Sequence, residues 1–216
     1  MTSQTCFALP LLLLSVMAGI FALSARWLGA EAGYLLGFGF YWLFWCLLAP
    51  RWLLGKLEFA ALLRDRAPLF SRANWLAALL WLTVTLVSVF LYAGDFLRAP
   101  LTLVLLAAPL ATLNGFCEEI LWRGLYVRRF PLNPCLAILY PSLGFALWHL
   151  APQVIFPAEN VIGFIVSTFF LALPYGFIAY RTGSARWTAL SHSLSGILAL
   201  SGYLAPSVLA LFGVYQ

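Results

Sequence analysis

Two adjacent glutamates, Glu118 and Glu119, lie inside a strongly apolar stretch, and Arg123 follows four residues after the second. The surrounding residues, Leu101–Val127, contain no other charged side chain. A carboxylate at the centre of a membrane helix costs about 2.5–3.5 kcal/mol on insertion scales, so such residues usually face a protein interior or a wet cavity and mark function. We therefore expect the pair to belong to a buried site, where a carboxylate can serve as a general base.

The chain has only two histidines, and each lies in a separate apolar segment. His149 ends the sequence Phe145-Ala-Leu-Trp-His149, and His192 lies shortly before Ser195 and Gly196. On a helix, Glu119 and Arg123 are spaced to pair on one face, whereas Glu118 points about 100° away. A purely structural ion cluster explains Glu119 and Arg123 but leaves Glu118 without a partner in the sequence. We therefore favour a functional site.

The composition is that of an integral membrane protein. The chain has 216 residues, of which 64% are hydrophobic and 9% charged, and its mean hydropathy is +0.97. A soluble domain carries about 25% charged residues, so this chain lacks the polar groups to cover a globular surface. Its pI is about 9.2. The basic residues stand singly or in pairs at the ends of apolar runs, however, which indicates orientation in a bilayer rather than nucleic-acid binding.

Seven apolar runs are long enough to cross a bilayer, for which a helix needs about 20 residues. The runs are Phe7–Ala25, Ala32–Leu54, Trp75–Gly94, Leu101–Val127, Pro134–Leu150, Val161–Tyr180 and Trp187–Ala205. We therefore predict an all-α fold, a polytopic transmembrane helix bundle with about seven spans. The tail, Pro206–Gln216, is too short to cross alone, and it either caps the bundle or completes an eighth span.

The segment Gly55–Asn74 is the longest polar stretch of the chain, and in it basic residues alternate with leucines and a phenylalanine. That pattern is typical of an amphipathic helix lying in the plane of the lipid headgroups. A partner-binding surface is the alternative, and the sequence does not separate the two.

The distribution of Lys and Arg predicts the orientation. Seven spans place nine such residues on the side of the N-terminus and only two, Arg26 and Arg98, on the other. The nine are Arg51, Lys56, Arg64, Arg66, Arg72, Arg128, Arg129, Arg181 and Arg186. Since cytoplasmic loops carry an excess of Lys and Arg, we predict a cytoplasmic N-terminus and an external C-terminus.

No metal and no cofactor are predicted. The four cysteines, Cys6, Cys46, Cys117 and Cys135, have no short repeated spacing, so they indicate neither a disulfide framework nor a zinc cluster. We interpret them as small buried hydrophobic residues. The two histidines are 43 residues apart and neither belongs to an HExxH pattern. A zinc site assembled in space from two His and one Glu is the alternative to the metal-free mechanism that we favour.

Three motifs carry a family resemblance: Glu118-Glu119-x-x-x-Arg123, Phe145-x-x-x-His149 and the later His192. The flanking sequences Glu119-Ile-Leu-Trp-Arg-Gly-Leu and Tyr180-Arg-Thr-Gly-Ser add to it. On these residues the chain resembles the CAAX protease and bacteriocin-processing family of glutamic-type intramembrane endopeptidases, which is related to the Ras-converting CAAX endopeptidase. The resemblance covers roughly the second half of the chain, from Leu101 to Ala205.

The resemblance implies a peptidase that uses water without a metal ion. It implies that Glu118 is the general base that activates the water and that His149 shares the proton. It further implies that His192 helps to bind the oxyanion, and that Glu119 with Arg123 orients Glu118. Donors fixed near a developing oxyanion are each worth about 100–1,000-fold in rate.

The chain departs from the family at one position of the third motif. The family usually has Asn or Asp four residues after the histidine, where this chain has Gly196. Ser195, and Asn114 one turn before Glu118, are the candidate substitute donors. The departure leaves open a different substrate, a slower enzyme, or a non-catalytic immunity or binding module of the same fold. A small transporter or proton relay is a further alternative, although no two repeated halves are evident.

We divide the chain into three regions. Residues 1–99 hold the N-terminal transmembrane segments and the interfacial helix, residues 100–205 the CAAX-protease-like catalytic region, and residues 206–216 the apolar tail. The expected partners are the lipid bilayer and a membrane-associated protein or peptide substrate, in a processing or sorting role. The compact length and the lack of recognisable eukaryotic targeting signals favour a bacterial cytoplasmic membrane.

Overall fold

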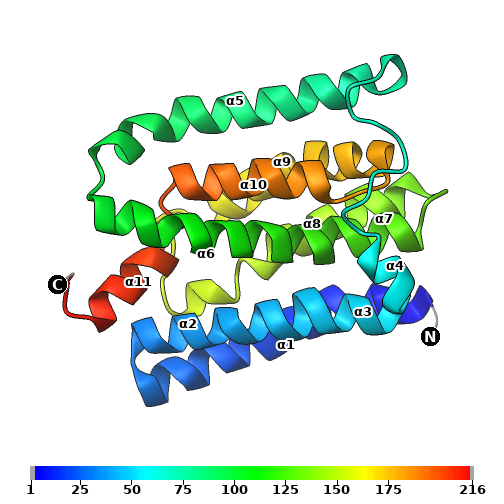
Figure 1. Cartoon of the computed structure of the whole chain (residues 1–216). Coiled ribbons are helices and arrows are strands. Elements are labelled where there is room, and N and C mark those ends of the chain that lie inside the picture. Colours follow the sequence, from blue (N-terminus) through cyan, green and yellow to red (C-terminus); the bar gives the residue numbers. More distant parts are fainter. Residues whose placement is uncertain (1–2, 215–216) are drawn as a thin grey trace.

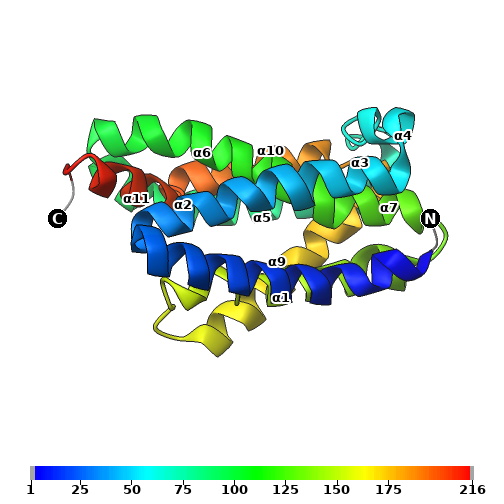
Figure 2. The same cartoon turned by 90° about the horizontal axis from the view of Figure 1, so that it is seen from below.

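The computed structural model describes residues 3–214, and in this range the chain is helical without any strand. Long helices run along one common direction, as Figures 1 and 2 show. Six of them are long and apolar enough to cross a membrane: Thr5–Leu28, Ala30–Leu54, Arg72–Arg98, Leu101–Arg129, Cys135–Val154 and Val161–Thr182. The predicted fold class, a polytopic transmembrane helix bundle, is thereby confirmed.

Several of these long helices are composite, because π-helical turns interrupt them. The first two spans are α1 (Ser3–Leu28), and α2 (Ala30–Phe40) with η1 (Tyr41–Leu48) and α3 (Ala49–Leu54). After α4 (Lys56–Ala60) and η2 (Arg72–Asn74) come α5 (Trp75–Arg98), and α6 (Leu101–Glu119) with η3 (Ile120–Leu125) and α7 (Tyr126–Arg129). The remaining elements are η4 (Cys135–Leu139), α8 (Tyr140–Trp148), η5 (Pro152–Val154), α9 (Val161–Thr182), α10 (Arg186–Leu198) and α11 (Leu204–Leu211).

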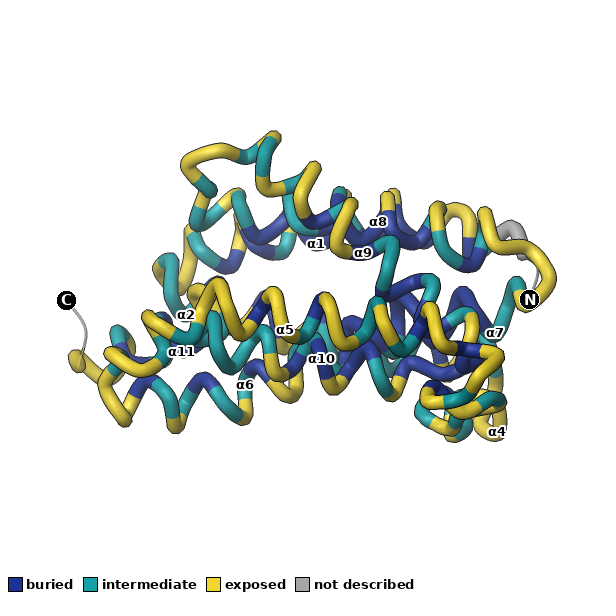
Figure 3. Tube along the Cα trace, turned by 90° about the horizontal axis from the view of Figure 1, so that it is seen from above, coloured by how far each residue is buried: buried dark blue, intermediate teal, exposed yellow. Residues whose placement is uncertain are grey.

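α6 and α10 pack against each other between the two edges of the bundle that Figure 1 shows. In Figure 1, α1 and α2 form one edge and α5 the other, with α6, α8, α9 and α10 between them. Much of α5 is exposed, and Figure 3 shows yellow on each of its turns, alternating with teal and blue. The largest buried cluster is rich in aromatic side chains from α1, α2, η1, η3 and α8. This cluster supports the residues around Glu118 from one side.

The seventh predicted span differs from the structure, because the apolar run Trp187–Ala205 is not one helix. α10 has 13 residues, and a left-handed turn with φ of 57° at Leu200, 57° at Ser201 and 54° at Gly202 separates it from α11. A helix of this length is too short to cross a bilayer alone. Its five serine, threonine and histidine side chains, from Thr188 to Ser195, suit a helix packed against α5, α6 and α9 rather than against lipid. α1 nevertheless begins and α11 ends at opposite ends of the bundle (Figure 1).

The interfacial helix predicted over Gly55–Asn74 is limited to the five residues of α4. Residues 61–71 instead form an irregular segment, here called the strap, which lies across the end of the bundle. Its backbone bonds to the protein: the amides of Arg66 and Ala67 donate to the carbonyl of Thr182, and the carbonyl of Leu62 accepts from the amide of Ala185. These bonds replace the helical ones, so the strap is held by the protein itself.

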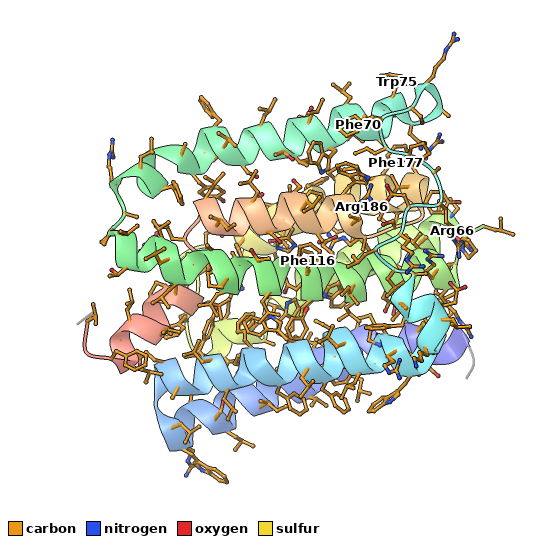
Figure 4. All side chains as sticks on the ribbon, viewed as in Figure 1. Arg66, Phe70, Trp75, Phe116, Phe177 and Arg186 are labelled. Atoms are coloured by element: carbon orange, nitrogen blue, oxygen red, sulfur yellow. The ribbon has the colours of Figure 1, made fainter. Side chains whose placement is uncertain are left out.

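The basic residues gather at the strap. Nine of them flank or lie in the segments at this end, whereas Arg26 ends α1 and Arg98 ends α5 at the other. Figure 4 shows Arg66 and Arg186 at the strap. We call the end of the bundle with these nine residues the basic end, and the end with Arg26 and Arg98 the opposite end. The arrangement fits the predicted segregation of charge, and the cytoplasmic location of the basic end remains a prediction.

The close contact between α6 and α10 depends on Gly115. A Cβ atom there would lie 2.6 Å from Ser193 Oγ and 2.7 Å from the Ser193 backbone nitrogen. We expect Gly115→Ala to lower the thermal unfolding temperature in detergent, because overpacking costs about 1–3 kcal/mol. Gly94→Ala in α5 is the matched control, since a Cβ there meets nothing within 4 Å. Equal unfolding temperatures for the two variants would contradict this packing.

Candidate active site

Glu118 is buried, and its two carboxylate oxygens are held by donors from different helices. Oε1 accepts a hydrogen bond of 3.0 Å from Nε1 of Trp148, and Oε2 accepts one of 3.1 Å from Nδ2 of Asn114. Asn114 is fixed in turn by Trp42, whose Nε1 donates to Asn114 Oδ1 at 2.8 Å. Charge-assisted bonds of this kind stabilise and orient the ionised carboxylate. Two bonds leave further lone pairs of the carboxylate free to accept from water.

Glu119, Arg123 and His192 form a second group directly beside it. Glu119 Oε1 lies 3.0 Å from Arg123 Nη1 and 3.0 Å from His192 Nδ1. His192 Nε2 lies 3.5 Å from Glu118 Oε2. The imidazole of His192 therefore stands between the two carboxylates, and only a protonated ring can donate towards both. The pairing predicted for Glu119 and Arg123 is present.

The guanidinium of Arg123 is enclosed by aromatic rings. Its Cζ lies 4.3 Å from the centroid of Phe145 and 5.6 Å from that of Tyr175. Its exposed fraction is 1%. Ring faces and one carboxylate thus take the place of water around this buried cation. The contact to Phe145 also ties Arg123 to the helix that carries His149.

His149 is oriented by a hydrogen bond within its own helix. Its Nδ1 lies 2.8 Å from the carbonyl oxygen of Phe145. Since a carbonyl can only accept, Nδ1 carries the hydrogen, and Nε2 of the neutral ring keeps its lone pair. The ring is partly exposed and packs edge-on against Phe145 and Phe164. His149 is therefore set up to accept a proton at Nε2.

Two cavities have His149 in their walls. Cavity A has a volume of about 290 Å³ and is lined by Glu118, Asn114 and His149 together with aromatic side chains of α2, α9 and the α10–α11 turn. Cavity B has a volume of about 260 Å³ and lies between α5, α9 and α10 against Arg123, His149 and His192. A smaller space of about 100 Å³ joins Asn114, His192 and Gly196. Four of the five predicted residues, Glu118, Arg123, His149 and His192, line these cavities. The fifth, Glu119, is fully buried and contacts Arg123 and His192.

A stack of aromatic side chains supports the Glu118 donor. The ring of Trp148 stacks on Tyr41 with centroids 3.7 Å apart, and Tyr41 Oη accepts a hydrogen bond of 2.8 Å from Trp122 Nε1. Both Tyr41 and Trp122 lie in π-helical segments, which are frequent at functional sites. Sequence reasoning missed Trp42, Tyr41 and Trp148 in this role. The position of Trp148 beside His149 and that of Trp122 inside the first motif were the available signals.

Asn114 and Ser195, the two candidate substitutes for the family's Asn or Asp, already form hydrogen bonds to other groups. Asn114 donates to Glu118, and the hydroxyl of Ser195 bonds to Ser88 Oγ and to the carbonyl of Ser191. Gly196 itself lies against α6: a Cβ atom there would be 3.0 Å from Cβ of Ala111. The glycine at this position therefore belongs to the tight packing of α10 on α6. Glu118 Oε2 thus has Asn114 Nδ2 at 3.1 Å and His192 Nε2 at 3.5 Å.

The cysteines form no disulfide, and the described residues contain no cluster suited to a metal ion. Cys6, Cys46 and Cys117 are buried and Cys135 is exposed, and all four are free thiols. Within residues 3–214, no set of three His, Cys, Asp or Glu side chains is arranged to hold a metal ion. The described site therefore consists of carboxylate, imidazole, guanidinium and amide groups. Metal independence of the reaction stays a prediction.

Comparison with known proteins agrees with the resemblance seen in the sequence. Residues 100–198 match the family model described as type II CAAX prenyl endopeptidase Rce1-like. This range holds both glutamates, the arginine and both histidines of the candidate site. No curated protein and no solved structure matches the chain.

The bond from Trp148 to Glu118 offers a test of the charge on Glu118. We expect Trp148→Phe to lower the free energy of unfolding by about 1.5–3 kcal/mol, as for a bond to a charged acceptor. Trp81→Phe is the matched control, because Trp81 Nε1 donates to the neutral carbonyl of Trp187 at 2.7 Å, a bond worth about 0.5–1.5 kcal/mol. Denaturation in detergent compares the two variants. A larger loss for Trp81→Phe would contradict an ionised Glu118.

Proposed function

Residues 100–198 belong to the Rce1-like family of type II CAAX prenyl endopeptidases, and from this premise we propose that the chain is a glutamate-dependent, metal-independent intramembrane endopeptidase. Its substrate is a membrane-associated protein or peptide, which it cleaves in processing or sorting. The observation that carries the proposal is the position of Glu118, whose carboxylate is held by Trp148 and Asn114 at the wall of cavity A.

Glu118 is the proposed general base. A water molecule in cavity A gives one proton to the Glu118 carboxylate while its oxygen attacks the carbonyl carbon of the peptide bond. The C–N bond then breaks as the leaving nitrogen takes up that proton from Glu118, either directly or after its transfer to Nε2 of His149. His149 supports this transfer because its Nδ1 is fixed on the Phe145 carbonyl, which leaves Nε2 to exchange the proton. General acid–base catalysis of this type contributes about 100–10,000-fold.

His192 is the proposed donor to the oxyanion. Glu119 holds Nδ1 of His192, so Nε2 is the nitrogen that faces Glu118 and the reacting carbonyl. Arg123 keeps Glu119 in place through their ion pair. Glu119 and Arg123 thus act as positioning residues, and they act through His192 rather than directly on Glu118. This modifies the role that the family resemblance implies for them.

Substitution of Glu118 tests the proposal. We expect Glu118→Gln to abolish cleavage while the variant keeps its fold, since an amide of equal size lacks the basic oxygen. Purified wild-type and variant protein would be incubated with membrane proteins from the host, and new termini mapped by mass spectrometry. Glu159→Gln, in the exposed loop before α9, is the matched control and should cleave like the wild type. New termini that persist with Glu118→Gln would reject the assignment and favour a non-catalytic or differently catalytic relative.

Gly196 allows a second test, on the oxyanion side. We expect Gly196→Asn alone to destabilise the chain, because its Cβ atom meets Cβ of Ala111. Adding Ala111→Gly removes that contact and lets the amide enter the small space beside His192. The double variant should then cleave faster than the wild type, since an oxyanion donor is worth about 100–1,000-fold in rate. A stable double variant without any gain would indicate that His192 alone suffices.

A further inference from the structure

The candidate active site is closed towards the basic end. Beyond Glu118 and Glu119 along η3 and α7 come Leu121, Trp122, Leu125 and Tyr126, each 0–1% exposed. Leu62 of the strap, 1% exposed, covers Gly124, where a Cβ atom would lie 3.3 Å from its side chain. These buried apolar side chains lie between the carboxylates and the basic end.

The strap that completes this layer is fixed by several polar contacts. Asp65 Oδ2 lies 2.5 Å from Arg186 Nη2 and accepts a hydrogen bond of 2.9 Å from Trp187 Nε1. Arg128 donates to the carbonyl of Ala61 at 2.6 Å. The closure at the basic end is therefore part of the fold.

Cavity A reaches the surface at the opposite end. Its wall includes Gln153 and Ala158 from the α8–α9 connection, and Ser201 and Tyr203 from the α10–α11 connection. Both connections lie at the end of the molecule where α11 ends (Figure 1). Tyr203 is 49% exposed, so the wall continues to the surface.

Cavity B reaches the surface on the side of the bundle. Its lining includes Leu91 of α5 and Leu171 of α9, which are 59% and 46% exposed. Exposed leucines in the middle of membrane helices face lipid. An apolar segment in the bilayer can therefore approach His149 and His192 from the side.

The charges decide which end is which. Nine basic residues at the basic end against two at the opposite end predict that the basic end lies in the cytoplasm. We infer that the candidate active site opens to the extracytoplasmic side, so that its substrate is a membrane-anchored peptide whose cleavable segment lies outside the cytoplasm. This inference rests on the proposed function for its substrate and on cavity geometry and charge for its side. If its site opens outside the cytoplasm, the chain differs from enzymes that cleave the cytoplasmic tails of proteins.

Thiol labelling tests the side independently of catalysis. Single cysteines would be introduced by Ala158→Cys at the rim of cavity A, by Ser201→Cys deeper in its wall, and by Ala60→Cys at the basic end, with Cys135→Ser removing the exposed natural thiol. A membrane-impermeant maleimide would be added to intact spheroplasts and to inverted membrane vesicles. We expect labelling of the first two in spheroplasts, and of Ala60→Cys only in inverted vesicles.

Two labelling outcomes would overturn the inference. One is the reverse pattern, with Ala60→Cys labelled in spheroplasts and Ala158→Cys only in inverted vesicles. The other is Ser201→Cys protected in both preparations, which would mean that cavity A does not open at this end. Because labelling needs no turnover, the same pattern is expected in a Glu118→Gln background. The termini mapped for the wild type then separate the two claims: cuts at cytoplasmic ends of membrane anchors reject the side alone, and the absence of cuts rejects the proposed function alone.

Discussion

The close approach of α6 and α10 is the constraint on which the candidate site depends. α6 carries Glu118 and Glu119, and α10 carries His192. The two backbones can meet because glycines stand on both sides of the contact, Gly115 opposite Ser193 and Gly196 opposite Ala111. In a membrane, where no hydrophobic effect drives helices together, small residues permit the packing and polar groups add to it. The imidazole thus reaches two carboxylates that belong to a different helix.

The contacts of Glu118, Glu119 and Arg123 explain why two carboxylates are tolerated inside an apolar helix bundle. A buried charge is costly unless it is paired and hydrogen-bonded. Glu119 has Arg123 and His192, and Glu118 has Trp148 and Asn114. Arg123 gains contacts with the faces of Phe145 and Tyr175. Each charge therefore has at least one partner on another helix, and the cluster connects α6, α8, α9 and α10 while Glu118 still borders cavity A.

The sequence predicted the residues of the site better than their contacts. The spacing of Glu119 and Arg123 predicted their pairing, because one turn of helix decides it. The contact of His192 with both carboxylates depends on the tertiary approach of α10, which no local pattern encodes. The bond from Trp148 to Glu118 was missed for the same reason, and Asn114, named as a candidate substitute donor for the oxyanion, donates to Glu118 instead. Trp148 in particular reads as an interfacial indole until the fold places it against Glu118 and Tyr41.

The helical class was predictable from hydropathy, and the end of the seventh predicted span was not. The run Trp187–Ala205 is apolar enough to suggest one helix, yet it breaks at Leu200 and Ser201, two non-glycine residues with positive φ. Such backbone is disfavoured by about 1–3 kcal/mol per residue and persists only where surrounding contacts enforce it. Here the Ser201 amide donates to the Gly196 carbonyl at 2.6 Å, and the Ser201 hydroxyl donates to the Ala107 carbonyl at 2.9 Å. The turn that results forms part of the wall of cavity A, and a straight helix would have carried Tyr203 away from that wall. The irregular backbone and the proposed route to the catalytic water are therefore two aspects of one local structure.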